Sequence, residues 1–354
     1  MTTLTVDERI SSTSTLAKVL KRPEIGAFVA ALAIFAFFAV STDVFATPAG
    51  ASTWLRGAST IGIMAVAVAL LMIGGEFDLS AGAITGFTGL VVGILTTEYG
   101  LNIWAAILVS LGLALAVGAV NGILVMRTGL PSFIVTLGTF FVLQGIDLAG
   151  TKALIGQVAI QGMSNVPYYD QAKSVFGSTL TIGFDWMPGT RFDGNLSVFA
   201  SVFWWLAVTA VATWILLRTR TGNWIFSVGG AQQSARQVGV PVFKTKVGLF
   251  MTTAGAGWLV GMLLLFSTST VQSNTGVGQE FIYIICAVVG GCLMTGGYGS
   301  AIGAALGALI YGMVSQGIVY SGWDNNWLRA FLGVMLLAAV LLNEWVRKRA
   351  ETAR

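Results

Sequence analysis

Gly74-Gly75-Glu76-Phe77-Asp78-Leu79-Ser80 interrupts an apolar run that extends from Gly57 to Thr97. This run is too long for one membrane crossing and suits two, because a spanning helix needs about 20 mostly apolar residues. The interruption carries two carboxylates and no positive charge. It therefore marks either a turn between two spanning helices or a helix broken inside the bilayer. A carboxylate at such a place indicates a functional site, because an unsatisfied charge in hydrocarbon is costly.

The overall composition is that of a multispanning membrane protein. Of the 354 residues, 55% are hydrophobic and only 10% are charged, whereas soluble domains carry about 25% charged residues. The chain has no histidine, which excludes histidine-based triads, metal sites and proton relays. It also lacks the G-x-x-x-x-G-K-[ST] phosphate-binding loop, which excludes ATP hydrolysis by that route. We expect neither a metal nor a cofactor.

We expect an all-α polytopic fold with about ten spanning helices. Each candidate span is an apolar segment near the length that a membrane requires. The charge-free stretch 281–323 is long enough for two of them, with a break at the glycine-rich segment 295–299. The predicted spans are 25–42, 57–73, 81–97, 103–126, 133–149, 198–217, 247–270, 281–294, 300–320 and 327–346.

The distribution of charge predicts the orientation. With the N-terminus in the cytoplasm, most of the Lys and Arg residues fall on the inner side, as the positive-inside rule requires, and the C-terminus is cytoplasmic as well. Two connections are too long to be simple turns. The predicted organisation is a cytoplasmic segment 1–24, a transmembrane domain 25–346 with an outer loop 150–197 and a cytoplasmic loop 218–246, and a cytoplasmic tail 347–354.

The spans also suggest two related halves. The second to fifth spans begin outside, and the seventh to tenth begin inside. Each set contains a glycine-rich break, at 74–82 and at 290–299. Opposite topology with matched breaks predicts an inverted repeat, an arrangement that recurs in transporters.

The polar residues of the first break have two interpretations. Asp78 or Ser80 could cap the following helix by accepting hydrogen bonds from its free N–H groups, and the helix dipole favours a carboxylate there. Alternatively, Asp78 and Ser80, with Gly75 beside them, line a polar pathway and meet a hydroxylated substrate. Glu76 is expected to face the aqueous boundary.

Three polar residues of the fifth span could face the same pathway. They are Thr136, Thr139 and Gln144, and they follow Pro131, a residue that suits a helix start. The alternative for the two threonines is structural, because a threonine hydroxyl can bond back to its own helix backbone.

Small residues at regular spacing predict helix packing. Gly299, Gly303 and Gly307 recur every four residues and form a close-packing face for another helix, either of the same chain or of a second copy. Cys286 and Cys292 are six residues apart, which is about 240° around a helix. They are therefore expected to point apart, to form no disulfide, and to face lipid or pack in the interior.

The cytoplasmic loop contains a candidate docking segment. Residues 234–238 suit a short helix that ends at Gly239, a common C-cap residue. This region is either a solvated loop beside the membrane or a docking helix for a cytoplasmic partner. The residues assigned to the docking segment are Gly222, Gly230, Ser234, Ala235, Arg236 and Gly239.

Four segments together carry a family resemblance. Residues 74–82 are similar to G-G-x-D-L-S-x-G, with one extra residue at Glu76 or Phe77. Residues 131–139 are similar to P-x-F-I-V-T-L-G-T, and residues 290–303 to G-G-x-x-x-x-G-G-x-G-S-x-x-G. Residues 222–239 are similar to G-x-x-x-x-A-I-G-G-N-x-x-A-A-R-x-x-G, with Val228 for Ile and Ala231 for Asn. In this order and spacing, the chain resembles the ribose/xylose-type permease subunits of bacterial ABC importers.

The resemblance implies a permease without an ATPase of its own, in the bacterial inner membrane. It would import a monosaccharide, such as a pentose, a hexose or a sugar alcohol. Its implied partners are a cytoplasmic ABC ATPase subunit, which would bind the family's coupling loop, an extracytoplasmic substrate-binding protein, and a second permease copy in a homodimer. No nucleic-acid partner is implied.

Other functions remain open at this point. An ion-coupled secondary transporter would use Asp78 or Glu76 as its coupling carboxylate. A scaffold or receptor subunit is a third class, although it needs no polar breaks within its spans. Within the permease family, nucleosides, furanoside signals and branched-chain amino acids are alternative cargoes.

Overall fold

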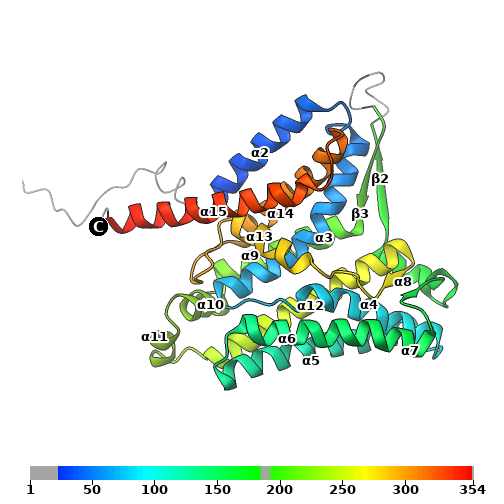
Figure 1. Cartoon of the computed structure of the whole chain (residues 1–354), viewed down its shortest axis with the longest axis horizontal. Helices are drawn as coiled ribbons and strands as arrows, with labels where there is room; N and C mark the ends of the chain where they lie inside the picture. The colour runs from blue at the N-terminus through cyan, green and yellow to red at the C-terminus, as the bar shows by residue number, and fades with distance from the viewer. Residues whose placement is uncertain (1–22, 185–189, 191–192, 353–354) are drawn as a thin grey trace, which may run out of the picture.

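The computed structural model describes residues 23–184, 190 and 193–352, with the backbone alone for 23 and 342–352. Long helices dominate the described part, and its strands form two two-stranded sheets (Figure 1). The predicted all-α polytopic fold is thereby confirmed. The predicted cytoplasmic segment 1–24 lies outside the described residues except for Pro23 and Glu24, and the predicted tail 347–354 is described only to residue 352.

Each predicted span coincides with a helix. Among the described residues, seven helices are long and apolar enough to cross a membrane, and three shorter apolar helices occupy the remaining predicted spans. The number of crossings and the side on which each terminus lies stay predictions. The ten helices are α2 (Pro23–Ser41), α3 (Pro48–Ile73), α4 (Ala81–Thr97), α5 (Ile103–Thr128), α6 (Ser132–Gly145), α9 (Ala200–Arg218), α12 (Val242–Thr268), α13 (Gln279–Val289), α14 (Ala301–Tyr320) and α15 (Trp327–Thr352).

The two long connections are structured. Figure 1 places the pieces of the predicted outer loop at one end of the bundle, and α10, α11 and the C-terminal end of α15 at the other. The pieces of the predicted outer loop are the π-helical turn η1 (Ile146–Gly150), α7 (Thr151–Ile155), β1 (Ala159–Ile160), η2 (Met163–Asn165), α8 (Tyr169–Phe176), β2 (Thr179–Gly183) and β3 (Asn195–Phe199). Strands β2 and β3 pair antiparallel, and β1 pairs antiparallel with β4 (Val271–Gln272). The predicted cytoplasmic loop forms α10 (Arg220–Gly230) and α11 (Gln232–Gln237).

Several helix ends differ from the predicted spans. Helix α3 begins at Pro48 rather than residue 57, because Thr47 caps it by accepting the N–H of Gly50 at 3.1 Å. Helix α12 begins at Val242 rather than residue 247, so that Lys246 lies in its second turn. Hydropathy marks the apolar part of a helix, whereas caps set where the helix begins and ends.

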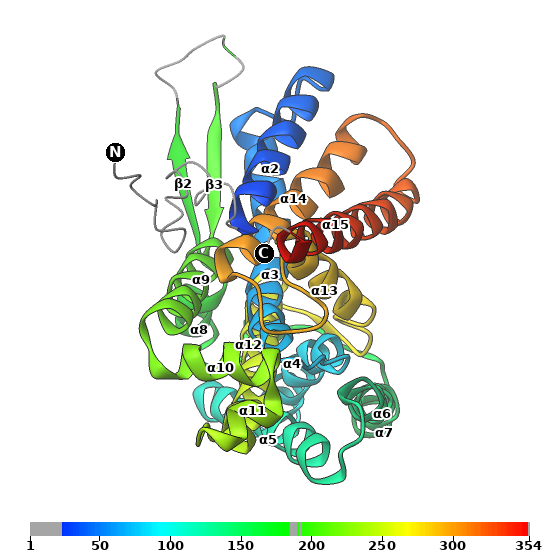
Figure 2. The same cartoon turned by 90° about the vertical axis from the view of Figure 1, so that its left-hand side faces the viewer.

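The core is built around α3. From Gly62 to Ile73 every residue of this helix is buried, as expected for a helix that is apolar on all sides. It packs against α9, α12, α13 and α14, and Figure 2 shows it running through the centre of the molecule. Helices α5 and α6 lie at the periphery, where α6 packs against α4 and α5 and leaves its remaining surface exposed.

The two glycine-rich breaks end their helices in the same way. After α3, Gly75 has φ +83°, its N–H binds the carbonyl of Met72, and the N–H of Glu76 binds the carbonyl of Leu71. The end of α13 repeats this pattern: Gly291 has φ +94°, and the two bonds run from Gly291 to Val288 and from Cys292 to Ala287. Both are Schellman motifs. The second break thus begins at Gly290, and the predicted helical span 281–294 is wrong at its C-terminal end.

Candidate functional site

The two breaks and the end of α10 meet at one junction of glycines. The N–H of Gly297 donates to the carbonyl of Ile73 at 2.8 Å. A Cβ on Gly296 would lie 2.8 Å from the Cα of Gly75, and a Cβ on Gly229 would overlap the carbonyl of Ile73. Only glycine lets three backbones approach so closely. The junction therefore joins both breaks to the predicted docking segment.

The first break is tied to α6 by two side chains. The N–H of Phe77 donates to the hydroxyl of Ser132, and the N–H of Leu79 to the hydroxyl of Thr136, each at 3.0 Å. The Thr136 hydroxyl also donates to the carbonyl of Ser132 at 2.8 Å. Thr136 thus does what its structural interpretation predicts and also holds the break in place.

A chain of buried hydrogen bonds leads from α6 to Asp78. The Thr139 hydroxyl donates to Asn121 Oδ1 at 2.6 Å, and Asn121 Nδ2 donates to the Ser80 hydroxyl at 2.9 Å. The Ser80 hydroxyl donates to Asp78 Oδ1 at 2.5 Å, and the same oxygen accepts the N–H of Ser80 at 2.8 Å. The other oxygen, Asp78 Oδ2, is buried and has no hydrogen-bond partner among the described residues.

These hydrogen bonds bear on the two interpretations of Asp78 and Ser80, capping of α4 and lining of a polar pathway. Ser80 occupies the N-cap position of α4 but forms no side-chain cap, so the capping role predicted for it is wrong. Its hydroxyl is occupied by Asn121 and Asp78 instead. Asp78 Oδ1 accepts the backbone N–H and the hydroxyl of Ser80, the N-cap residue. Asp78 Oδ2 has no hydrogen-bond partner among the described residues.

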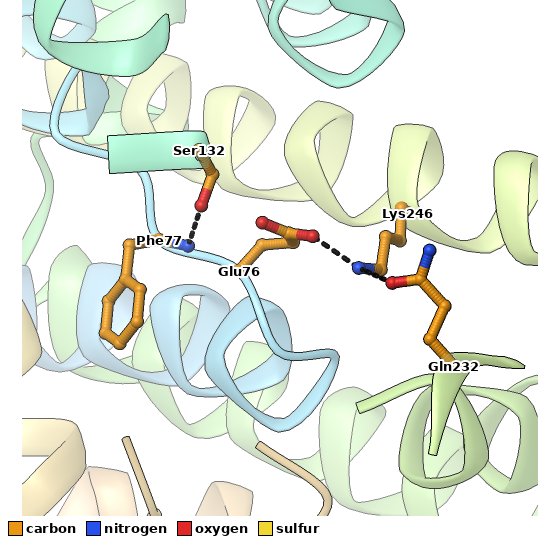
Figure 3. A network of polar contacts seen from close by, with 5 residues as sticks. All are labelled: Glu76, Phe77, Ser132, Gln232 and Lys246. Carbon is orange, nitrogen blue, oxygen red and sulfur yellow. Dashed lines mark hydrogen bonds and ion pairs between the residues drawn. The ribbon is translucent and has the colours of Figure 1, made fainter. Parts of the chain in front are cut away.

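Glu76 does not face water, contrary to the prediction. Its side chain is 11% exposed and forms an ion pair with Lys246, whose own side chain is 5% exposed. The ammonium also donates to Gln232 Oε1 at 2.7 Å. Figure 3 shows Lys246 of α12 between Glu76 in the first break and Gln232 of α11. A cation from a distant segment thus neutralises the Glu76 carboxylate of the break.

Not every predicted pathway residue belongs to these contacts. Gln144 is half-buried, and its side chain makes no hydrogen bond to the described residues. Conversely, four polar residues of the site were not predicted. Asn121 had a signal, because an amide is unusual in an otherwise apolar span. Lys246 was interpreted only as an inner positive charge. The four are Ser132, Asn121, Gln232 and Lys246.

The predicted docking residues are distributed over α10 and α11. Gly222 and Gly230 lie on α10, where a Cβ on Gly222 would overlap the carbonyls of Ile215 and Leu216. On α11, Ala235 is buried against Val228 and Val242, whereas Ser234 and Arg236 are exposed. Gly239 has φ +84° just beyond the end of this helix. Of the predicted docking residues on α11, therefore, Ser234 and Arg236 are exposed to a partner and Ala235 is not.

Gly299, just before α14, and Gly303 and Gly307 within α14 pack against the segment that contains both cysteines. A Cβ on Gly303 would overlap the carbonyl of Gly290, and a Cβ on Gly307 the carbonyl of Cys286. Gly299 lies close to the Cys292 sulfur, 2.6 Å from the position of its missing Cβ. The partner of these glycines is thus α13 and the break that follows it, within the same chain. Both cysteines are buried and unpaired, so that of the two expected environments they occupy the interior.

Asn121 is expected to stabilise the break. Substituting alanine would leave the hydroxyls of Ser80 and Thr139 without their amide partner, at a cost of about 1–3 kcal/mol in the free energy of unfolding. Unfolding of the detergent-solubilised protein measures this loss. Asn223→Ala, at an exposed position of α10, is the matched control. Equal stability of the two variants would contradict a structural role for the amide.

Comparison with known proteins assigns the family. Residues 50–340 match the model of a family described as "Branched-chain amino acid transport system / permease component". The chain is 31% identical to the probable ABC transporter permease protein y4mJ of Sinorhizobium fredii (strain NBRC 101917 / NGR234), over 81% of this chain and 79% of that protein.

Two further relatives carry the name of a sugar. The fructose import permease protein FrcC of Rhizobium meliloti is 27% identical over 91% of this chain and 85% of its own length. The ribose import permease protein RbsC of Escherichia coli (strain K12) is 28% identical over 89% of this chain and 92% of its own length. No solved structure matches the chain. The resemblance to ribose/xylose-type permeases is confirmed, and the chain belongs, as a multi-pass inner-membrane protein, to the family of the branched-chain amino acid transport system permease component.

Proposed function

We propose that this chain is the membrane-spanning subunit of an ABC importer for a monosaccharide, such as a pentose, a hexose or a sugar alcohol. The observation that carries the proposal is the junction of the two breaks with α10. It links a break lined by hydroxyl and carboxylate groups to a segment suited to docking a cytoplasmic partner. The named cargoes of two relatives, fructose and ribose, favour a sugar.

Energy would enter through α10 and α11. A separate ATPase subunit would bind their exposed side and move them as it closes around ATP. Gly229 contacts the first break directly, and Gln232 contacts it through Lys246 and Glu76. Movement of α10 and α11 would therefore shift the first break and the polar groups tied to it. An extracytoplasmic binding protein would deliver the sugar at the opposite end of a permease homodimer.

The ion-coupled alternative loses one of its two carboxylates. A coupling carboxylate must exchange its ion during transport, whereas Glu76 is bound by Lys246 within the same chain. Asp78 remains, with one oxygen held by Ser80. If Asp78 coupled an ion, Asp78→Asn would abolish the ion dependence of uptake. We expect no ion dependence to lose, and weaker transport from a loosened break.

The proposal is tested with proteoliposomes that contain the purified permease. We expect uptake of radiolabelled ribose or fructose to require ATP, the ATPase subunit and the binding protein together. Uptake by the permease alone, driven by an ion gradient, would overturn the proposal. Uptake of a branched-chain amino acid in place of both sugars by the complete complex would overturn the cargo class while keeping the importer.

A variant of α11 tests where the ATPase subunit binds. Bulky residues at Ala235 or Gly239 are poor probes, because Ala235 is buried and Gly239 has a positive φ. Val238 is 79% exposed at the end of α11. We expect Val238→Glu to weaken binding of the ATPase subunit at least about tenfold, or 1.4 kcal/mol. Val238→Leu, which keeps an apolar contact, should bind normally. Normal binding by both variants would contradict a docking role for α11.

A further inference from the structure

Asp147 is a buried carboxylate that the importer site described above does not use. It lies in η1, the π-helical turn that continues α6, and it is only 3% exposed. No hydrogen bond or ion pair joins its side chain to another described residue. A π-helical turn inside a helix is uncommon and frequently marks a functional site. A carboxylate that is so largely buried is costly unless a partner satisfies it, which points to a ligand.

The carboxylate borders a cavity of suitable size. The cavity holds about 380 Å³, within the range of roughly 300–1,000 Å³ typical of small-molecule sites. Most of its lining is aliphatic, from α4, α5 and α7. Besides Asp147 and Gly150, the other members are Phe87, Tyr99 with its ring and phenol hydroxyl, and Thr151 with its hydroxyl. A few polar groups in a mainly apolar hollow are the usual composition of a ligand site.

This cavity adjoins a second one that reaches Thr139, whose hydroxyl is connected to the first break through Asn121 and Ser80. The second holds about 690 Å³ between α5 and α6 and includes Gly138 and Thr139 in its lining. Both cavities are lined by Phe87, Leu113 and Ile146, so they meet along one seam. Asp147 follows Thr139 by eight residues, or about 12 Å along the helix. The two cavities therefore carry polar groups at two levels: Thr139 on the side of the first break, and Asp147 farther along the helix toward α7.

The chemistry of the outer cavity fits a sugar. A carboxylate accepts hydrogen bonds and can bind two hydroxyl donors at once, while aromatic rings offer flat apolar surface to the C–H face of a pyranose or furanose. We propose that Asp147 binds hydroxyl groups of the transported monosaccharide in the outer part of the translocation path. Phe87 and Tyr99 contact the sugar ring there. This inference rests on the proposed function and adds a binding residue to it.

Two other occupants of the cavity make different predictions. A lipid acyl chain would fill the apolar part and leave Asp147 without a donor. An inorganic cation would bind Asp147 and make uptake depend on that cation. A sugar is favoured because the same seam reaches Thr139, whose hydroxyl belongs to the network of the first break.

The test uses the reconstituted importer with its ATPase subunit and binding protein. Asp147→Asn keeps the size of the side chain and removes its charge. We expect its uptake of ribose or fructose at low sugar concentration to fall about tenfold or more, since hydrogen bonds to charged groups contribute that much binding. ATPase stimulation by the binding protein should stay at the wild-type level. Asp170→Asn, at an exposed position of α8, is the control and should transport normally.

A second readout does not depend on transport. A hydrophobic fluorescent carbodiimide should label the wild-type complex more than the Asp147→Asn complex, and the same sugar should suppress that difference. Wild-type uptake by Asp147→Asn, or labelling that the sugar leaves unchanged, would overturn the assignment and leave lipid as the occupant. If wild-type uptake requires a particular inorganic cation and the Asp147→Asn complex has lost this requirement, the occupant is the cation, and the assignment is overturned. If the wild-type complex shows no ATP-dependent uptake, the proposed function fails, which is a separate result.

Discussion

Lys246→Met is expected to lower the free energy of unfolding by about 3–5 kcal/mol, because removing one member of a buried ion pair leaves the other charge uncompensated. The substitution keeps most of the side-chain volume and removes the ammonium that binds Glu76 and Gln232. Denaturant or thermal unfolding of the detergent-solubilised permease measures the loss. ATP-coupled uptake should fall as well, because the link between α11 and the first break is lost.

Two comparisons separate the ion pair from a general effect of losing a lysine. Lys244→Met, two residues earlier at an exposed position, should unfold like the wild type. The double variant Glu76→Gln/Lys246→Met removes both charges and should recover most of the stability, since a buried pair replaced as a whole is close to neutral. A double variant as unstable as Lys246→Met would show that the carboxylate is not what Lys246 compensates.

Gly229→Ala is expected to separate α10 from the two breaks. The new Cβ would overlap the carbonyl oxygen of Ile73 and lie 2.7 Å from the amide nitrogen of Gly297. These are backbone atoms, and overpacking against them should cost about 3 kcal/mol. The junction would have to open, so we expect ATP-coupled uptake to be abolished while the spans remain folded. Unfolding temperature and uptake by the reconstituted complex are the two measurements.

Another glycine provides the matched control. Gly248 lies on α12 with open space where a Cβ would be, so Gly248→Ala meets nothing and should gain up to about 1 kcal/mol from helix propensity. A Gly229→Ala variant that unfolds and transports like Gly248→Ala would contradict the close approach of the three backbones.

Much of the fold follows from local sequence. Hydropathy located the ten apolar helices of the described residues, and the glycine pairs located both breaks. The end of α11 near Gly239 was predicted from glycine's tolerance of positive φ. Span ends were less accurate, as at Pro48 and Val289, because caps and Schellman motifs depend on a few hydrogen bonds rather than on average hydropathy.

The candidate site was predictable in part. The heptapeptide and Thr136 were singled out from the sequence, and the structure brings them together. Asn121 could have been found, since it is an amide within an apolar span. The role of Glu76 could not, because a glutamate beside a predicted turn is most simply interpreted as solvent-exposed. Its burial depends on a lysine 170 residues away in the sequence.

The sequence by itself determined the class of this protein, its apolar helices, its two glycine breaks and its family, because hydropathy and glycine conformation are local properties of the chain. Only the tertiary structure decided what those breaks contact. It placed Lys246 against Glu76, Gly229 against Ile73, and Asp147 beside a cavity. The physical reason is that burying a charge, or bringing backbones together, depends on which distant segments approach, and local sequence does not specify that approach.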